Sequence, residues 1–579
     1  DDLYRDDIDK FIEYNLNDVE IVKALDQKFK LLDLARAVSH LGRIPYEEVY
    51  FSSRYIEGAM LVYLRSLGLV APSKLPTASY DGSEGRFSGA YVKSPVPGCY
   101  DWVFDLDLTS MYPSIIMSLN MSPETKIGKI NGWDAEEFIR GEDKHYSVEK
   151  EKKVIRTFTS GELKDFFGKN EISISSNGVL YDLTKKGVIP AILEKWFNER
   201  VEYRKLAKKY ETEGDLELHG YFNRRQLVQK ILLNSLYGVL GLTVFRFYDI
   251  DNAEGTTTTG QELIKFTEKV TNSYYNKILK TDEDYCIYTD TDSVFYSALP
   301  LVKNRFPNAD VKDEKFMTEQ ILDIADEVQS YINKSYNYFS SRFLNIQGDH
   351  RFEIKQEMIA KAAFWVTKKR YGQWIINDGG TPCEKLDVKG LDIVRSSFPP
   401  AFRDFMTKVL KAILAKVPKE RIDEFILEFK GNLKNEELDK IALPTGVKGI
   451  KKYTKKKSKG GFGGSGKGIF TEMMKGAPVH TKASVIYNDL LRYFKVNKHE
   501  AISNGNKVRW VYLKENPLKI DGLAYKGYDD PKQIIDFINQ YVDRDKLFDK
   551  ALKKKIQMFY DAMSWDMPVD KKNSIERFF

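Results

Sequence analysis

The stretch YTDTDS, residues 288–293, decides how the rest of the chain is interpreted. It lies between two short runs of aromatic and β-branched residues, 285–287 and 294–296, which predict two strands joined by a tight polar turn. The turn carries Asp290 and Asp292, whose mutual repulsion raises one pKa unless a cation lies beside them. Mg²⁺ suits this role, because it takes one or two protein carboxylates and leaves positions for phosphate oxygens. A solvated acidic turn is the commoner explanation of an isolated Asp-x-Asp motif, so the interpretation depends on the rest of the sequence.

Composition sets the first limits on function. The chain has 579 residues, of which 42% are hydrophobic, enough for several domains with real cores. Its net charge is only +6, so nucleic-acid binding has to be argued from local clusters of cations. Cys99, Cys286 and Cys383 lie far apart without Cys-x-x-Cys spacing, which argues against disulfides or a zinc site and fits a reducing compartment. No apolar run could span a bilayer and the acidic start is no signal peptide, so we expect a soluble, intracellular, non-secreted protein.

A second acidic segment precedes a turn into a helix. Residues 100–108 alternate as a strand does, and both Asp105 and Asp107 fall on one face, opposite the face of Phe104. The strand runs into TSMYPS, residues 109–114, where the proline favours the start of a helix. A strand that ends in carboxylates and turns into a helix N-terminus suits a phosphate and its metal. The alternation alone does not choose between Asp105 and Asp107.

Long helical patterns occupy much of the remaining chain. The periodicity predicts helices over residues 8–40, 52–67, 190–212, 215–241 and 314–340, and it predicts little within the polar insertion 130–185. The helices 190–212 and 215–241 form an αα-hairpin. Lys230, Asn234 and Tyr237 make a polar stripe on the second of them, and Gly238 leaves room for a flat group to approach. A solvated helix face is the simpler explanation of this stripe.

Cations interleaved with aromatic residues follow in the second half of the chain. The block KKRY, residues 368–371, lies between strand-like segments, a pattern typical of contact with a nucleic-acid backbone, although a charged hairpin tip is the alternative. Beyond residue 390 the chain becomes helical and basic. Residues 448–467 predict a flexible cationic loop that could order on phosphates.

Four blocks of the sequence closely resemble, in their order along the chain, the motifs of family B DNA polymerases, especially the replicative enzymes of T-even-like bacteriophages. The blocks are residues 107–114, 230–238, 288–293 and 368–371. The resemblance runs from about Tyr14 to the C-terminus. It implies an α+β right-hand fold with an antiparallel-sheet palm, α-helical-hairpin fingers and a mainly helical thumb. The implied division is an exonuclease remnant with linker helices (1–75), palm (76–189, with the insertion 130–185), fingers (190–242), palm (243–389) and thumb (390–579).

The resemblance also implies roles for individual residues. It chooses Asp107 over Asp105, so that the metal ligands are Asp107, the backbone carbonyl of Leu108, and Asp292. Asp290 and Lys230 complete the catalytic set. The implied nucleotide-binding residues are Ser110, Met111, Tyr112, Arg200, Arg204, Lys230, Asn234 and Tyr237, with the Tyr112 ring excluding a ribose 2′-hydroxyl. The implied DNA-binding residues are Gly238, Lys368, Lys369, Arg370, Tyr371, Arg395, Lys451 and Lys452.

The activity implied is template-directed DNA synthesis in phage replication, in the cytoplasm of an infected bacterial host. The substrates are primer–template DNA and deoxynucleoside triphosphates, and the cofactor is Mg²⁺, two ions per site, with Mn²⁺ able to substitute. Two alternatives remain open at this point. One is another palm polymerase, such as a reverse transcriptase or an RNA-dependent RNA polymerase. The other is a DNA-binding subunit with an inactive polymerase site. A primer-extension assay distinguishes such a subunit from an active polymerase.

The resemblance also predicts features at both ends of the chain. Tyr14 and Asp18 resemble the last acidic motif of a 3′–5′ exonuclease, and no Asp-x-Glu-bearing strand precedes them. We expect the nuclease to be incomplete in this chain, which is then a fragment or the product of a split gene whose separate exonuclease polypeptide binds near Asp18. At the other end, Ile575, Phe578 and Phe579 resemble a tail that binds a sliding clamp.

Overall fold

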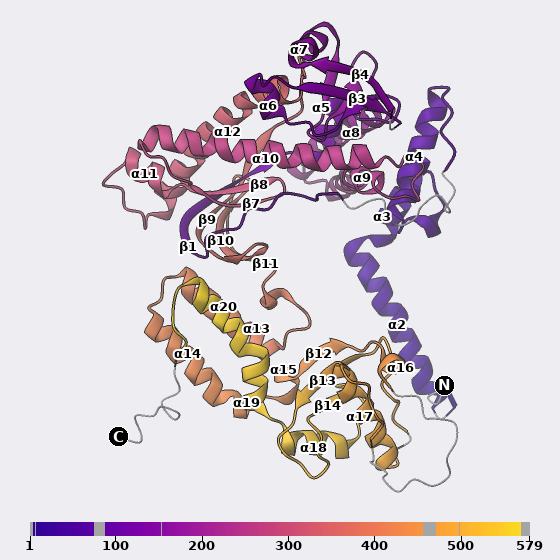
Figure 1. Cartoon of the computed structure of the whole chain (residues 1–579). Helices are drawn as coiled ribbons and strands as arrows, with labels where there is room; N and C mark the ends of the chain where they lie inside the picture. Colours follow the sequence, from indigo (N-terminus) through magenta and orange to yellow (C-terminus); the bar gives the residue numbers. More distant parts are fainter. Residues whose placement is uncertain are drawn as a thin grey trace. The chain divides into compact units, whose positions relative to one another are not determined.

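The computed structural model describes residues 4–5, 7–74, 87–151, 153–454, 470–496 and 498–568 (Figure 1). Helices and antiparallel sheets both contribute, so the protein is α+β. The chain forms two compact units. The first comprises Asp1–Val92, Asp105–Phe295 and Leu322–Gln356, and the second Lys93–Phe104, Tyr296–Ile321 and Glu357–Phe579.

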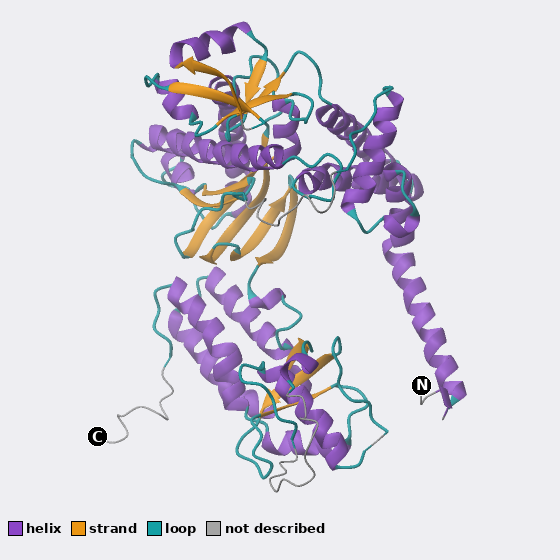
Figure 2. Cartoon of the chain, turned by 45° about the vertical axis from the view of Figure 1, so that its right-hand side comes forward, coloured by secondary structure: helices purple, strands orange, loops and turns teal. Residues whose placement is uncertain are grey.

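A six-stranded sheet organises the acidic motifs, and Figure 2 shows its strands in orange. The strand order is β11-β10-β9-β1-β8-β7, with bounds β1 (Gly98–Leu108), β7 (Cys286–Asp290), β8 (Ser293–Ser297), β9 (Ile354–Thr367), β10 (Arg370–Asp378) and β11 (Thr381–Lys389). The pairs β9–β10 and β10–β11 are antiparallel. Because only two residues join β7 to its neighbour β8, these strands form the hairpin that the sequence predicts. The strand predicted over 100–108 is confirmed as β1.

The expected alternation of faces along β1 is wrong. Residues 102–106 are all buried, and Trp102 has a left-handed backbone with φ +49° that interrupts the regular pleat. Since β1 lies in the middle of the sheet, between β9 and β8, both of its faces are covered and no polar face is needed. Asp105 is therefore buried, with 8% of its surface exposed, whereas Asp107 near the end of the strand is partly exposed.

Helices make up most of the first unit. They are α2 (Ile8–Phe29), α3 (Leu31–Gly42), the short η1 (Tyr46–Glu48), α4 (Ser52–Ser66), α5 (Met111–Leu119), α8 (Val188–Thr212), α9 (Leu216–Leu240) and α10 (Ile250–Leu279). The predicted hairpin of helices is confirmed as α8 and α9, joined at Gly214, whose φ of +78° suits a glycine. The single helix predicted over 8–40 is interrupted at Lys30, which has a left-handed φ of +53° between α2 and α3. Helix α5 begins two residues before Pro113 rather than at it.

Helix α10 is absent from the sequence-based expectations. Its N-cap, Asp249, accepts a hydrogen bond from the amide of Asn252, and the helix then continues for 30 residues. It packs against α12 (Glu314–Phe343), the helix predicted over 314–340, where the Thr267 and Tyr336 hydroxyls lie 2.8 Å apart. The contact buries both hydroxyls, so α10 is a core element of the first unit.

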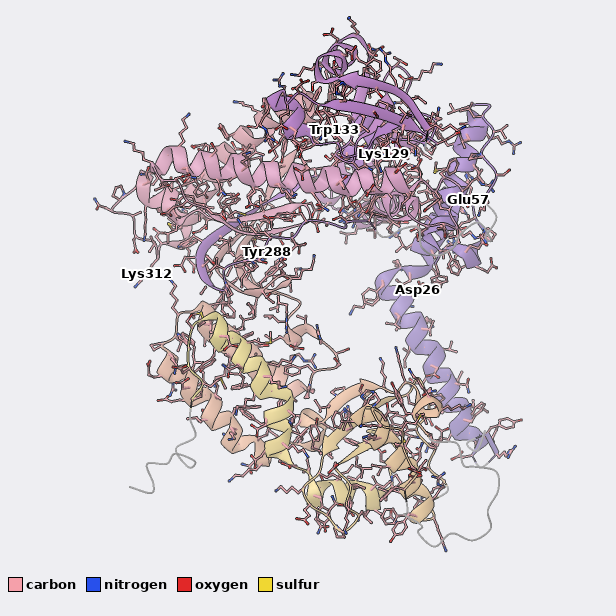
Figure 3. The ribbon with its side chains drawn as sticks, in the orientation of Figure 1. Asp26, Glu57, Lys129, Trp133, Tyr288 and Lys312 are labelled. Carbon is pink, nitrogen blue, oxygen red and sulfur yellow. The ribbon has the colours of Figure 1, made fainter. Side chains whose placement is uncertain are left out.

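The polar insertion folds around an apolar core of its own. Its antiparallel sheet has the order β4-β3-β2-β6-β5, with β2 (Lys126–Ile130), β3 (His145–Lys150), β4 (Lys153–Thr159), β5 (Ile172–Ile174), β6 (Val179–Asp182), and the helices α6 (Ala135–Arg140) and α7 (Ser160–Lys169). Trp133 packs on Phe138 in this core, 5.0 Å between ring centroids. Lys126 joins the insertion to the start of α10 through Asp251 at 3.1 Å. Lys129, labelled in Figure 3, contacts the same carboxylate at 2.9 Å.

The second unit combines strands β9–β11 with helices and a small sheet. Its helices are α11 (Leu299–Arg305), η3 (Asp392–Val394), α13 (Pro400–Leu414), α14 (Lys419–Asn432), η4 (Leu433–Asn435), α15 (Leu438–Ile441), α16 (Ile450–Tyr453), α17 (Val479–Tyr493), α18 (Lys532–Tyr541), α19 (Arg544–Leu547), the π-helix η5 (Phe548–Lys553) and α20 (Lys554–Ala562). The small sheet has the order β12-β13-β14, from β12 (Leu443–Gly446), β13 (Lys507–Tyr512) and β14 (Gly522–Tyr525). Among the described residues, no helix is both long enough and apolar enough to cross a membrane.

A buried ion pair fixes the segment between α9 and α10. Glu57 on α4, labelled in Figure 3, has only 8% of its side chain exposed and lies 3.0 Å from Nε of Arg246. Lys74 lies 2.7 Å from the other carboxylate oxygen, and Arg246 also donates to the carbonyl of Pro72 at 2.8 Å. Removing one partner of such a pair leaves a poorly compensated charge in the interior.

We predict that Arg246→Ala lowers the free energy of unfolding by about 2 kcal/mol, because the buried Glu57 carboxylate loses a charged hydrogen-bond donor and keeps only Lys74 as an ion-pair partner. The first transition of a urea titration measures this loss, and adding Glu57→Gln should recover part of it. Arg140→Ala is the matched control: its 58% exposed side chain pairs with Glu142 at 3.0 Å, and loss of a surface pair costs at most about 1 kcal/mol. Equal losses in the two arginine variants would contradict the prediction.

Candidate active site

The structure brings the end of β1 against the turn between β7 and β8. The backbone amide of Leu108 donates a hydrogen bond to the carbonyl of Asp292 at 2.9 Å. The hydroxyl of Ser293 donates to Oδ2 of Asp107 at 2.7 Å. Asp107 and Asp292, which come from distant parts of the sequence, are therefore neighbours where the end of β1 meets this turn.

Backbone strain marks both sides of this meeting point. Thr291 has φ +63°, and Ser110, which precedes α5, has φ +49°. Such conformations cost about 1–3 kcal/mol for residues other than glycine and collect at functional sites. The amide of Thr291 donates to the carbonyl of Tyr91 at 3.0 Å, so the segment before β1 helps to hold the strained turn in place.

The carboxylate of Asp290 is held by hydroxyl groups of its own hairpin. The hydroxyl of Tyr288, which is fully buried, donates to one carboxylate oxygen of Asp290 at 3.1 Å. The hydroxyl of Thr291 donates to the other oxygen at 3.0 Å. Both oxygens of Asp290 thus accept hydrogen bonds from within the hairpin.

The hairpin of α8 and α9 carries the three cations expected to bind a triphosphate, Arg200, Arg204 and Lys230. Nε of Arg200 approaches Oε1 of Gln226 at 3.5 Å, and Gln226 lies one turn before Lys230 on α9. The pKa of Arg200 is lowered from its ordinary value, first by burial and then by repulsion from Arg204. Within the described part of the chain, no carboxylate forms an ion pair with Arg200, Arg204 or Lys230. The concentration of like charge favours binding of a polyanion such as a triphosphate.

Two tyrosines connect the helical hairpin to the acidic turn. The rings of Tyr112 on α5 and Tyr237 on α9 lie 4.3 Å apart between centroids, tilted by 31°. The pKa of Tyr112 is raised, first by burial, then by Tyr237 and by the negative charge of Asp292. The Asp292 carboxylate thus lies near enough to Tyr112 to contribute to its raised pKa. No atom lies within 4 Å of a Cβ added at Gly238, so the surface beside Tyr237 is open.

Two contributors to this site have no role in the sequence-based expectations. Ser293 orients Asp107, and its place beside the two aspartates was the only signal available. Gly260 lies on α10, where a Cβ would come within 3.0 Å of Met111 and 3.2 Å of Tyr112. Since α10 itself was not predicted, sequence reasoning had no means of finding this close approach.

The expected DNA-binding block occupies the turn between β9 and β10 of the second unit. Lys368 and Lys369 are exposed there, and Lys369 has φ +58°. Arg370 donates to Asp392 at 2.7 Å, and Tyr371, only 7% exposed, stacks on Trp365 at 5.4 Å between ring centroids. Of the four residues, the two lysines are presented to solvent, and the other two make contacts within the unit.

The remaining expected residues lie apart from these clusters. Arg395 is 58% exposed and lies 3.6 Å from Asp392. Lys451 and Lys452 are exposed on α16, whereas most of the predicted cationic loop lies outside the described residues. Tyr14 and Asp18 are exposed on α2, which has no buried residue. Ile575, Phe578 and Phe579 also lie outside the described residues.

The donor chemistry of the acidic site fits a hard divalent cation. Asp107, Asp292 and the carbonyl of Leu108 offer oxygen ligands only, and the described residues contain no group of three or more His, Cys, Asp and Glu side chains arranged for a metal. Mg²⁺ needs no such group, because it binds through one or two carboxylates and completes its shell with water and phosphate oxygens. The residues present therefore fit Mg²⁺ better than a metal that needs a dedicated protein cage.

Comparison with known proteins identifies the family. Residues 48–561 match the pattern of DNA polymerase family B. The chain is 26% identical to the DNA-directed DNA polymerase of Enterobacteria phage T4 and 25% identical to that of Escherichia phage RB69, in each case over 98% of this chain and 65% of the relative. It is 26% identical to a DNA polymerase of Pyrococcus glycovorans over 76% of this chain and 46% of the relative. The chain belongs to DNA polymerase family B, and it spans 65% of the length of its two phage relatives.

We predict that Ser293→Ala weakens Mn²⁺ binding by roughly 10-fold, because a hydrogen bond that orients a metal-binding carboxylate contributes about that much affinity. Electron paramagnetic resonance of free Mn²⁺ during a titration measures the change. Ser297→Ala is the matched control from the same strand, since its hydroxyl donates to the backbone carbonyl of Asp101 at 2.7 Å. Wild-type affinity in the Ser293 variant would show that Asp107 needs no positioning by this hydroxyl.

Proposed function

We propose that this chain is a template-directed DNA polymerase that adds deoxynucleotides to a primer 3′-hydroxyl. The observation that carries the proposal is the meeting of Asp107 and Asp292, held by the hydrogen bonds of Leu108 and Ser293. Family membership supports it, as do the cations on the α8–α9 hairpin. The reaction joins the primer oxygen to the α-phosphorus of the incoming nucleotide and breaks that phosphorus's bond to the leaving pyrophosphate.

The site's residues divide this work. Two Mg²⁺ ions, when bound by Asp107, Asp292 and the Leu108 carbonyl, supply the charge that lowers the pKa of the attacking hydroxyl and neutralises the pyrophosphate. Arg200, Arg204 and Lys230 hold the triphosphate and stabilise the charge that builds on it. The Tyr112 ring lies under the sugar, and Tyr237 with the open surface at Gly238 faces the new base pair.

The elements correspond to a right hand in this proposal. The six-stranded sheet with α5 and α10 is the palm, and the α8–α9 hairpin is the fingers. Residues 390–579 are the thumb, and Lys368, Lys369, Arg395, Lys451 and Lys452 contact the primer–template backbone. We place Arg370 and Tyr371 behind this surface, because Arg370 pairs with Asp392 and Tyr371 stacks on Trp365.

The partners follow from the same resemblance. We propose that the C-terminal tail binds a sliding clamp and that the protein acts in an infected bacterial cell. A separate exonuclease polypeptide would bind along α2, where apolar side chains such as Ile12, Leu16 and Val19 are 49%, 62% and 63% exposed. Burying such side chains in an interface is favourable, at roughly 25 cal/mol per Å² of apolar surface.

Asp292→Asn tests the proposal directly. We expect the rate of primer extension with Mg²⁺ to fall by at least about 10³-fold, equivalent to roughly 4 kcal/mol of transition-state stabilisation, because a carboxylate ligand is lost. Single-turnover extension of a labelled primer measures the rate. Asp282→Asn, which changes an exposed aspartate shortly before β7, is the control and should keep full activity. Near-normal extension by the Asp292 variant would refute the assignment.

Tyr112→Ala tests the role of the tyrosine under the sugar. We expect the preference for deoxyribonucleotides over ribonucleotides to fall by about 100-fold, because the ring no longer excludes the 2′-hydroxyl; that fold-change corresponds to roughly 2.7 kcal/mol. The ratio of kcat/KM for the two sugars measures it. Tyr112→Phe keeps the ring and should keep the preference, so unchanged discrimination in the alanine variant would count against this role.

A further inference from the structure

A hollow whose lining includes four arginines lies between α3 and α9 of the first unit. Its volume is about 460 Å³, within the range of sites that hold small ligands or single nucleotides. The lining residues are Asp33, Arg36, Ala37, His40, Leu41 and Arg43 from the region of α3, and Tyr221, Arg224 and Arg225 from α9. None of these residues has a part in the nucleotidyl-transfer site described above.

The charge in this hollow is poorly compensated. Four arginines face one carboxylate, Asp33, which lies 3.5 Å from Arg36 in an exposed pair. Among the described residues, neither Arg43 nor Arg224 forms an ion pair with a carboxylate. The end of α3 contributes only about half a negative charge through its dipole. A concave surface with a net charge near +3 attracts anions more strongly than a flat one, because it focuses the field.

An exposed aromatic ring accompanies the charge. Tyr221 is 42% exposed, and the guanidinium of Arg225 lies 5.0 Å from its ring centroid. Arg225 also donates to the hydroxyl of Tyr203 at 3.3 Å, which holds it against both tyrosines. A tyrosine face beside arginine planes is the surface on which nucleic-acid bases stack, at roughly 1–3 kcal/mol per base. An isolated phosphate or an acidic peptide would make no use of it.

The backbone fixes the position of α3 and of Arg43. A Cβ on Gly42 would come within 2.5 Å of Cβ of Tyr55, and a Cβ on Gly58 within 2.1 Å of the carbonyl oxygen of Gly42. Helices α3 and α4 therefore approach as closely as glycine allows. Arg43 follows directly, with a left-handed φ of +52° that ends α3. The cations are thus carried on a preformed scaffold.

Helix geometry separates the hollow from the triphosphate-binding face of α9. At 3.6 residues per turn, Arg224 and Arg225 lie about 120° and 140° around the helix axis from Lys230, and roughly 8–9 Å along it. Arg36 and His40 lie about one turn apart on α3, and Arg43 follows directly after the helix ends. A stacked single strand carries a phosphate about every 3.4 Å, so this row matches a strand segment rather than one anion.

We propose that the hollow between α3 and α9 binds a single-stranded stretch of DNA, with phosphates on Arg36, Arg43 and Arg224 and a base on Tyr221. That the nucleic acid is DNA rests on the proposed polymerase function. The strand is the unpaired part of a primer–template substrate. The site gives the protein a second hold on its substrate, independent of the acidic turn.

The test is binding of a fluorescein-labelled 20-nucleotide oligothymidylate, followed by fluorescence anisotropy at several salt concentrations. Arg43→Ala/Arg224→Ala should raise Kd by 10-fold or more. It should also make the slope of log K against log salt shallower by about 1.4, because each phosphate contact on a single strand contributes about 0.7. Arg43→Lys/Arg224→Lys keeps the charge and should keep the wild-type slope, which separates lost contacts from misfolding.

Arg65→Ala/Lys169→Ala is the charge-matched control, since both side chains are exposed on the same unit and away from the hollow. It should bind like the wild type. Equal weakening by this control would overturn the proposal, because general electrostatics would then explain binding. Wild-type affinity and slope in the alanine variant would overturn it as well.

Competition identifies the ligand class. The competitors are pyrophosphate, a deoxynucleoside triphosphate and polyglutamate, each at the same concentration of charged groups as the oligonucleotide. Displacement by pyrophosphate or the triphosphate would overturn the proposal in favour of a small anion. Displacement by polyglutamate would overturn it in favour of an acidic protein. Primer–templates with a long and a one-nucleotide 5′ overhang complete the design. The wild type should bind the long overhang more tightly, and the alanine variant should lose that preference. These assays measure binding without catalysis, so their outcome is separate from that of primer extension.

Discussion

The hydrogen bond from the Leu108 amide to the Asp292 carbonyl is the constraint on which the candidate active site depends. It holds the end of β1 against the turn between β7 and β8, so that two carboxylates distant in sequence share one site. Two such charges repel one another unless a cation lies between them. The sheet keeps the backbones together despite this repulsion, and the Ser293 hydroxyl stabilises one carboxylate. The fold therefore prepares a position where a divalent cation is favourable.

Positively charged side chains occur in two different settings in this protein. Where cations serve the fold, they are paired, as Arg246 is with buried Glu57 and as Lys126 and Lys129 are with Asp251. Among the described residues, Arg200 and Arg204 on the α8–α9 hairpin, and Arg43 and Arg224 in the hollow beside α3, form no ion pair with a carboxylate. Repulsion among these arginines destabilises the folded protein, and a bound anion would reduce that repulsion. The contrast between paired and unpaired cations distinguishes structural positions from binding positions in this protein.

Prediction from sequence succeeded where the local pattern and the tertiary environment agree. The α8–α9 hairpin and the β7–β8 hairpin were both located, because helical periodicity and an acidic turn between β-branched runs are local signals. It failed at α10, where residues 256–259 are four consecutive threonines, a composition that favours strands. In the structure Thr256 and Thr257 are buried, and their hydroxyls bond to the carbonyls of Asn252 and Ala253 within the helix. Burial between other elements, which no local pattern records, makes that helix favourable.

The sequence by itself determined the kind of chemistry: carboxylates on a strand and on a turn, cations at helical spacing, and a tyrosine before the proline of α5. It could not choose between Asp105 and Asp107 by alternation, because residues two apart on a strand fall on the same face; in the structure Asp105 is buried and Asp107 is partly exposed. The tertiary structure decided that Asp107 meets Ser293, that Tyr112 packs on Tyr237, and that Arg370 and Tyr371 turn inward while Lys368 and Lys369 remain exposed. The physical reason is that residue type and spacing are local properties of the chain, whereas proximity between carboxylates, rings and cations depends on the register in which distant strands and helices pack.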